Sequence, residues 1–165
     1  MSKELATQYS FSDLEKMAAA IAASGLFGLR DSRQALGLML LCQAEGLHPA
    51  VAARDYHIIE GKPALKSDAM LARFQAAGGR VEFLTYTDRE VKARFSHPSG
   101  GSLEVSWTIE QAKTAHLTER IQKDGRPNMW QKYPRQMLRA RVISEGIRSV
   151  YPGVLVGVYT LSLIH

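Results

Sequence analysis

An alternating pattern between residues 81 and 107 places the tightest constraint on what this chain can fold into. Apolar residues occupy every second position in two runs, at Val91, Ala93 and Phe95 and again at Leu103, Val105 and Trp107. A period of two puts each run on one face of a β-strand. The preceding segment, 81–86, is also rich in strand-forming residues. Three antiparallel strands with one apolar face result, and helices have to cover that face. The sequence therefore predicts an α+β fold.

A helix bounded by two prolines is the best candidate for that cover. Pro134 fits a first helical turn, where its missing N–H costs nothing, and Pro152 ends the helix after Tyr151. At about 100° per residue, one face of this helix carries Lys132, Arg135 and Arg139, and the opposite face carries Arg141, Glu145 and Arg148. Apolar residues lie between them. We interpret this as a packed helix that presents guanidinium groups; a surface helix with solvated arginines is the alternative.

Helices and a hairpin are predicted before the meander. A capping box at Ser12–Glu15 begins a helix that runs to Ala23, and a second helix, 32–44, is apolar almost all round, which predicts a buried core helix. Segments 55–60 and 63–66 flank a Gly61–Lys62 turn and predict a β-hairpin. Ser67 caps a helix over 68–77, with Arg73 off its buried face.

A short helix and a loop are predicted after the meander, and composition divides the chain into three parts. A capping box at Thr108–Gln111 opens a short helix to about Ala115, and the polar run 116–128 predicts a loop. At 165 residues the chain is expected to form a single domain: N-terminal helices in 1–45, a core in 46–152 and an apolar C-terminal tail in 153–165. That tail either adds a strand to a sheet, its own or a neighbouring subunit's, or belongs to a longer protein that has been shortened.

Basic residues are concentrated in one window. Between Arg120 and Arg148 there are eight Lys or Arg against Asp124 and Glu145, a net +6, so the rest of the chain sums to −1 of the total +5. Trp130 and Tyr133 lie inside the window. Cations that follow phosphates, interleaved with rings that stack on bases, suit a single-stranded nucleic acid. On charge alone membrane headgroups would also suit, but the longest apolar runs fall well short of a membrane span, and no membrane partner is predicted.

Chemistry that would indicate an enzyme is missing from the sequence. Gly61–Lys62 is followed by Pro63, so no phosphate-binding loop is present, and the five histidines show no helical pair at zinc-ligand spacing. The one cysteine, Cys42, excludes an internal disulfide and fits a reducing cytosol. Asp55 with Glu60 and Lys62 superficially matches the ligand set of metal-dependent nucleases, but residues five apart in one strand point to opposite faces.

Two segments carry a family resemblance. Gly46-Leu47-His48-Pro49, followed by Asp55-Tyr56-His57-Ile58-Ile59, resembles a segment of the phage single-strand annealing proteins of the RecT/Redβ (Bet) family. The stretch from Trp130 through Arg135-Gln136-Met137-Leu138-Arg139-Ala140-Arg141 to Tyr151-Pro152 is similar to that family's tryptophan, basic helix and closing proline, especially in its RecT branch. The resemblance covers roughly residues 45–152, and its middle part is only compatible with the family.

The resemblance implies a fold, an activity and a set of partners. The fold would be a β-hairpin plus a three-stranded antiparallel β-meander packed against helices. The protein would bind single-stranded DNA and anneal complementary strands without ATP or another cofactor, with magnesium only as a counterion of the DNA. It would act as a ring or helical filament in the cytoplasm of a bacterial host. A phage exonuclease and a host single-strand-binding protein would be its protein partners.

The predicted DNA-binding residues combine the resemblance with the basic window. They are Lys62, Lys66, Arg73, Trp130, Lys132, Tyr133, Arg135, Arg139, Arg141 and Arg148. Whether Trp130 stacks on bases or packs in the core stays open at this point. Two other functions also remain as alternatives: a regulatory protein that binds a specific DNA sequence or RNA, and a metal-dependent nuclease built on Asp55 and Glu60.

Overall fold

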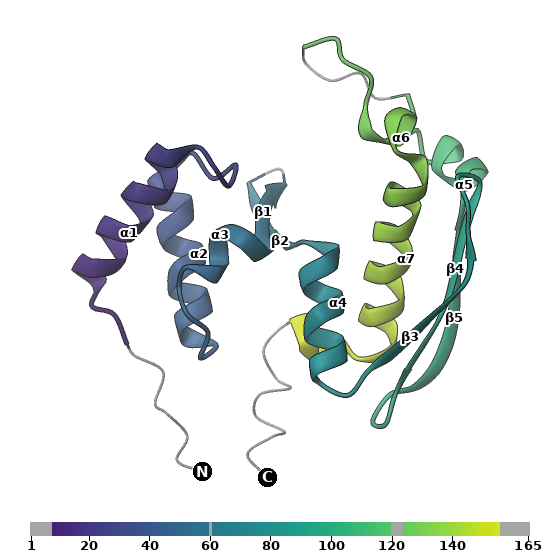
Figure 1. Cartoon of the computed structure of the whole chain (residues 1–165), viewed down its shortest axis with the longest axis horizontal. Coiled ribbons are helices and arrows are strands. Elements are labelled where there is room, and N and C mark those ends of the chain that lie inside the picture. Colours follow the sequence, from purple (N-terminus) through teal and green to yellow (C-terminus); the bar gives the residue numbers. More distant parts are fainter. Residues whose placement is uncertain (1–7, 60, 120–123, 156–165) are drawn as a thin grey trace. The chain divides into compact units, whose positions relative to one another are not determined.

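The computed structural model describes residues 8–59, 61–119 and 124–155 (Figure 1). It contains a two-stranded and a three-stranded antiparallel sheet together with helices, so the predicted α+β class is confirmed. Contacts divide the chain into two compact units at Lys66/Ser67, whereas composition suggested a subdivision after residue 45. Each unit is described by itself. No helix in the described part of the chain is long and apolar enough to cross a membrane.

The first unit begins with two helices, α1 (Phe11–Ser24) and α2 (Ser32–Ala44). The cap of α1 is Ser10, whose hydroxyl accepts a hydrogen bond from the Asp13 N–H at 3.1 Å, so the prediction of Ser12 as the cap is wrong. Both serines stand near the helix start, and only Ser10 has the extended backbone that a cap requires. Helix α2 has the predicted bounds, with Asp31 as its cap.

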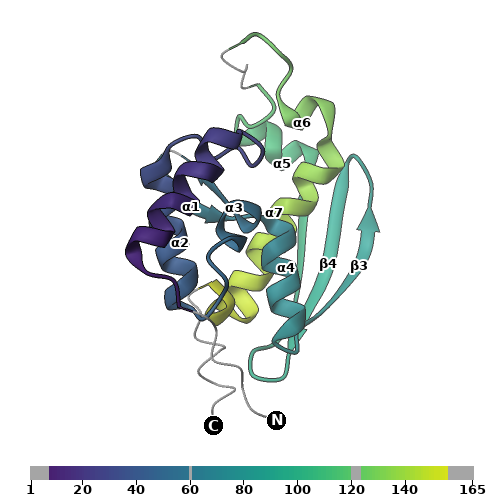
Figure 2. The same cartoon turned by 60° about the vertical axis from the view of Figure 1, so that its left-hand side comes forward.

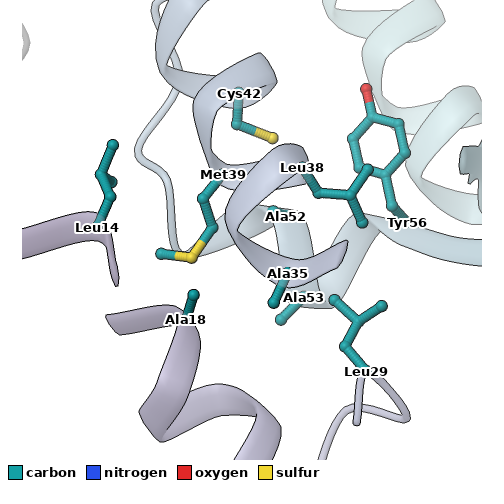
Figure 3. Packing of buried hydrophobic residues seen from close by; sticks show 10 residues of the cluster. All are labelled: Leu14, Ala18, Leu29, Ala35, Leu38, Met39, Cys42, Ala52, Ala53 and Tyr56. Carbon is teal, nitrogen blue, oxygen red and sulfur yellow. The ribbon is translucent and has the colours of Figure 1, made fainter. Parts of the chain in front are cut away.

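The core of the first unit lies between these two helices and a short third one, α3 (Val51–Asp55), as Figure 3 shows. Leu14 and Ala18 of α1 face Met39 of α2, and all three are essentially fully buried. Leu40 and Leu41, however, are 39% and 40% exposed. Helix α2 therefore buries one face only, although its apolar sequence predicted a buried core helix.

The predicted hairpin is present as β1 (Tyr56–Ile59) and β2 (Lys62–Leu65). The strands pair antiparallel from Tyr56↔Leu65 to Ile59↔Lys62, around a turn in which Gly61 has a φ of 76°. That left-handed backbone suits glycine, which has no Cβ to clash. Asp55, the predicted first residue of the strand, is instead the last residue of α3, a helix that the sequence pattern did not predict. Glu60 lies outside the described residues.

The second unit holds the predicted meander. Strands β3 (Arg80–Tyr86), β4 (Glu90–His97) and β5 (Gly101–Thr108) form a sheet in the order β3-β4-β5. Around it are α4 (Ser67–Ala76), α5 (Ile109–Thr114), α6 (Met129–Lys132), α7 (Pro134–Val150) and a 3₁₀ turn, η1 (Pro152–Leu155). The helix bounded by prolines and the capping box of α5 are confirmed. Of the predicted C-terminal tail, residues 156–165 lie outside the described residues.

Helix α7 covers the inner face of the sheet along β4 and β5, and α4 packs beside it (Figure 1). Figure 2 shows both helices on the same side of the sheet. Val91, Ala93 and Phe95 of β4 are 0% exposed beneath α7. The helix approaches so closely at Gly146 that a Cβ there would lie 2.3 Å from the Phe95 ring. A glycine at this position sets the distance between helix and sheet.

The outer face of the sheet is polar and carries an ion-pair network. Arg94 of β4 donates to Glu82 of β3 at 3.1 Å and to Glu104 of β5 at 2.6 Å, and Lys92 lies 3.4 Å from Glu104. Hydrogen bonds from Arg94 and then Lys92 lower the pKa of the Glu104 carboxyl. The charge of Arg94 is therefore balanced by two carboxylates on the same face, and that face is the solvated side of the sheet.

Gly146→Ala should destabilise the second unit by about 1–3 kcal/mol, because the new methyl group overpacks against Phe95. Gly37→Ala is the matched control. Gly37 lies in the middle of α2 with nothing near the added Cβ, so alanine should stabilise the first unit by about 0.5–1 kcal/mol. Urea unfolding followed by circular dichroism measures both. A Gly146→Ala protein with unchanged stability would mean that α7 does not pack this closely on the sheet.

Candidate nucleic-acid interface

Two arginines of α7 lie over two aromatic rings of β3. The guanidinium carbon of Arg135 is 5.1 Å from the centre of the Tyr86 ring, and that of Arg139 is 5.7 Å from the centre of the Phe83 ring. The arginines are four residues apart, one turn of the helix, so they lie on the same side of α7. A cation over an aromatic face is attracted by the ring's quadrupole. We call these four residues the arginine–aromatic surface.

Two carboxylates adjoin this surface. Asp68, in the first turn of α4, accepts from Arg139 Nη1 at 2.6 Å, and Asp88, in the turn between β3 and β4, lies 4.0 Å from Arg135 Nε. The carboxylate side chains are 81% and 70% exposed. Ion pairs in such an environment contribute at most about 1 kcal/mol each. A ligand with several negative charges can therefore displace them at little cost.

Arg135 also has an unused hydrogen-bond donor. Its Nε is buried and has no hydrogen-bond partner among the described residues. The Asp88 carboxylate at 4.0 Å is beyond hydrogen-bonding distance. Leaving a buried donor unsatisfied costs about 1–3 kcal/mol, and because this Nε is closed off from solvent, a charged acceptor recovers that free energy only once the Arg135 side chain moves. A phosphate oxygen is an acceptor of this kind, and guanidinium groups bind phosphate through two parallel N–H donors.

The net positive charge of the chain belongs to the second unit. Residues 67–165 contain fourteen Lys or Arg and nine Asp or Glu, a net +5, whereas residues 1–66 contain seven of each. Arg120 and Lys123 of the predicted basic window lie outside the described residues. A positively charged surface raises the local concentration of an anionic partner and speeds its association. The arginine–aromatic surface thus lies in the unit that would attract a polyanion.

Two of the predicted arginines lie elsewhere on α7. Arg141 is on the opposite flank, 5.3 Å from the centre of the Trp107 ring of β5, and the Trp107 Nε1–H donates to Glu145 at 2.6 Å. Arg148 donates to the Ser144 hydroxyl at 3.0 Å in the last turns of the helix. Thirteen residues of helix, roughly 20 Å, separate Arg148 from Arg135. Neither Arg141 nor Arg148 belongs to the arginine–aromatic surface.

The residues just before α7 are exposed. Lys132 ends α6 and lies 5.4 Å from the ring of Tyr133, which is 41% exposed and links α6 to α7. Both residues precede Pro134, so they are at the same end of α7 as Arg135. Both side chains are exposed and could reach a ligand, and their contact with DNA stays a prediction.

Two predicted DNA-binding residues are buried. Trp130 of α6 is 8% exposed, which answers the question left open by the sequence: it packs rather than stacks on bases. Arg73 of α4 is also 8% exposed, against the prediction that it lies off the buried face of its helix. The buried face of α4 is defined by Met70, one turn before Arg73, and Phe74, the residue after it. The Arg73 side chain lies close enough to that face to be enclosed. Neither residue offers a surface to a ligand.

The predicted hairpin lysines belong to the first unit. Lys62 is exposed at the start of β2, and the backbone N–H of Lys66 donates to the Asp55 carbonyl at 2.8 Å. The predicted contact of these lysines with DNA stays a prediction.

Of the alternative nuclease site, Asp55 lies among the described residues and Glu60 does not. Asp55 is 6% exposed, and its carboxylate pairs with the Arg54 guanidinium at 2.6 Å. No group of three or more His, Cys, Asp or Glu gathers at metal-binding distance among the described residues. A carboxylate held by a guanidinium is already neutralised, so Asp55 is a poor metal ligand in this arrangement.

A cleft of about 390 Å³ lies elsewhere in the second unit, between the start of β4 and α5. It is lined by Arg89, Glu90, Thr108, Ile109, Glu110 and Lys113. Lys113 pairs with Glu110 at 3.3 Å, and the two basic and two acidic side chains balance one another. This cleft lacks the excess positive charge of an anion-binding site.

Sequence reasoning missed four residues of the site: Phe83, Tyr86, Asp68 and Asp88. The two aromatic residues were predicted only to lie in the first strand of the meander, and the pattern could not show that α7 leaves them uncovered. One signal was available. Phe83 and Tyr86 are three positions apart in one strand, and such residues share a face only if the strand contains an irregularity.

Comparison of the chain with family models, curated proteins and solved structures finds no match in any of the three. What the chain binds therefore has to be inferred from its own residues and their geometry.

Trp130→Ala should cost about 3–5 kcal/mol of the free energy of unfolding, the usual range for removing a buried tryptophan. Thermal unfolding measures this loss, and Tyr133→Ala, at the exposed neighbouring ring, should change stability far less. A Trp130→Ala protein as stable as the parent would show that the indole is not packed, and it would return Trp130 to the list of ligand-binding candidates.

Proposed function

We propose that this protein binds single-stranded DNA and promotes the annealing of complementary strands without ATP. One observation carries the proposal: exposed aromatic rings and arginine side chains lie together on one surface of the basic unit. Single-strand-binding proteins combine cations for the backbone with rings for the bases in this way. The family resemblance of segments 46–74 and 130–152 supports the same reading.

Phosphate contacts on this surface would come from the guanidinium groups. Arg135 has an unsatisfied Nε donor, and Arg139 has a carboxylate partner that is mostly exposed to water. Contacts to the backbone carry no sequence information, so the binding would tolerate any sequence. Base edges would stay free, which is what pairing with a second strand requires.

Annealing needs no chemical step from the protein. Forming a duplex releases roughly 1.4 kcal/mol of stacking free energy per base-pair step. A protein accelerates the process by neutralising phosphates and by keeping many strand segments close together, and an oligomer does this more effectively than a single copy. Ring or filament assembly, action in the bacterial cytoplasm, and a phage exonuclease and a host single-strand-binding protein as partners are parts of the proposal that rest on the family resemblance alone.

The direct test is the annealing rate of two complementary oligonucleotides, one with a fluorophore and one with a quencher, in EDTA and without nucleotide. The parent protein should accelerate annealing, and log–log plots of the binding constant against salt should be linear, with a slope of about −0.7 per phosphate neutralised. Annealing that is no faster with protein than without it would remove the proposal. RNA oligonucleotides and a duplex library in the same assay detect the regulatory alternative, which requires preference for RNA or for one DNA sequence.

Arg139→Ala should weaken single-strand binding by about tenfold or more, since a charge-assisted hydrogen bond to phosphate contributes about 1.5–3 kcal/mol. Arg94→Ala is the matched control: it removes one exposed arginine from the same unit, but on the outer face, where Glu82 and Glu104 already balance its charge. Fluorescence anisotropy with a labelled oligonucleotide compares the two. Equal losses would mean that net charge alone governs binding and that α7 holds no special site.

Asp68→Asn should strengthen single-strand binding, up to about fivefold. The substitution removes the carboxylate that competes with phosphate for Arg139, and an exposed ion pair of this kind is worth at most about 1 kcal/mol. The gain should depend on Arg139, so an Arg139→Ala, Asp68→Asn double variant should bind like Arg139→Ala with only a small general charge effect. Weaker binding by Asp68→Asn would show that Asp68 orients Arg139 for the ligand instead of competing with it.

A further inference from the structure

Phe83 and Tyr86 are exposed although they point to the inner face of the sheet. Their cross-strand neighbours on β4 are Ala93 and Val91, both 0% exposed under α7. Phe83 and Tyr86 themselves are 37% and 45% exposed. Helix α7 lies along β4 and β5 and leaves this part of β3 open. Exposing aromatic surface costs roughly 25 cal/mol per Å² relative to burying it, so the arrangement is unfavourable for the free protein.

An irregularity in β3 brings the two rings to the same face. The pairing of β3 with β4 shifts register between Phe83 and Thr85, which leaves Leu84 as an extra residue. In a regular strand, positions 83 and 86 would point to opposite sides. With the extra residue, Phe83 and Tyr86 both point inward and their ring centres are 5.8 Å apart, at an interplanar angle of 59°. Bulges of this type commonly redirect a side chain toward a functional site.

Each ring has its own cation. Arg139 lies over Phe83 and Arg135 over Tyr86, and one turn of α7 separates the arginines just as the bulged segment separates the rings. The surface therefore repeats one unit twice: an aromatic ring for a base and a guanidinium group for the adjoining phosphate. A guanidinium plane is also a surface on which a base can stack. Two such units suit two successive nucleotides of one strand.

We infer that Phe83 and Tyr86 are the residues that make this surface selective for unpaired strands over duplex, each by stacking one base. The inference rests on the proposed function and deepens it. Bases within a duplex are stacked on their neighbours and have no free face, so a ring on the protein gains nothing from them. An unpaired strand exposes its bases, and stacking on aromatic side chains is tolerant of sequence because every base has a flat face.

The competing role for the two rings is to hold Arg135 and Arg139 in place. That role predicts a different result, because misplaced arginines would lose phosphate contacts to single strands and duplexes alike. The ratio of single-strand to duplex affinity therefore separates stacking from positioning. An abasic strand, which keeps the phosphates and lacks the bases, separates them a second time.

The test uses the full chain with Phe83→Ala and Tyr86→Ala, and anisotropy with a labelled single strand, its duplex and an abasic strand of the same length. Each variant should lose about 5- to 150-fold in single-strand affinity, with the affinity for duplex and for the abasic strand changed little. Tyr86→Phe keeps a ring and should retain binding. Phe83→Leu keeps the apolar volume and should bind like Phe83→Ala, which excludes a packing effect. A single-stranded RNA of the same sequence shows whether the sugar matters to the stacking sites.

Equal losses for single strand, duplex and abasic strand would overturn the inference and assign the rings a positioning role, while the proposed function stands. Retained binding by Phe83→Leu would overturn it as well, because apolar volume and not a ring would then be enough. A parent protein that neither binds single strands nor accelerates annealing would instead remove the proposed function itself. Thermal unfolding of each variant checks that the fold is intact. Both rings are partly exposed, so their removal should cost little stability.

Discussion

The second unit depends on the close packing of α7 against the sheet. Gly146 brings the helix backbone against the Phe95 ring, and Val142 and Ile143 complete a seam that excludes water. Because this contact fixes both the height and the rotation of the helix, it also fixes where the arginine side chains emerge. Arg135 and Arg139 emerge toward β3, and Arg141 emerges toward β5. The hydrophobic contact between α7 and the sheet thus determines where the positive charges of α7 lie.

Electrostatics at the site are finely balanced rather than strongly positive. Two arginines face two aspartates, but the carboxylates are mostly exposed and one of them is too distant for a hydrogen bond. Water screens such pairs, so they restrain the side chains without occupying them permanently. The free protein keeps its guanidinium groups extended over the rings, where cation–π attraction limits their rotamers, and an incoming polyanion would have less ordering to impose.

Much of the fold could be predicted from the sequence because local residue patterns determine it. Period-two alternation gave the strands, and Pro134 and Pro152 gave the long helix to within one residue. Where local signals competed, the prediction was wrong: Ser10 and Ser12 are both good caps, and only the tertiary path of the chain selects Ser10. Helix α3 is too short to have a periodic signal, and strand-forming residues follow it directly.

The site was harder to predict than the fold because burial is not a local property. Nothing local in the sequence distinguishes half-buried Arg139 from enclosed Arg73, or exposed Tyr86 from packed Trp130. Whether a helix covers a given residue depends on where that helix ends relative to a strand more than forty residues away in the sequence. Composition showed that the excess positive charge lies in the last third of the chain, and only the packing of α7 showed which side chains share a surface.

The extra residue at Leu84 makes the number of residues in β3 decisive for which side of the sheet each ring faces. Removing or adding one amino acid between positions 83 and 86 would turn one ring to the solvated side of the sheet, even if every other residue stayed the same. Exchange of phenylalanine for tyrosine or tryptophan would leave the geometry unaltered. In related sequences we therefore expect one aromatic residue to replace another at positions 83 and 86 more often than the number of residues between them changes.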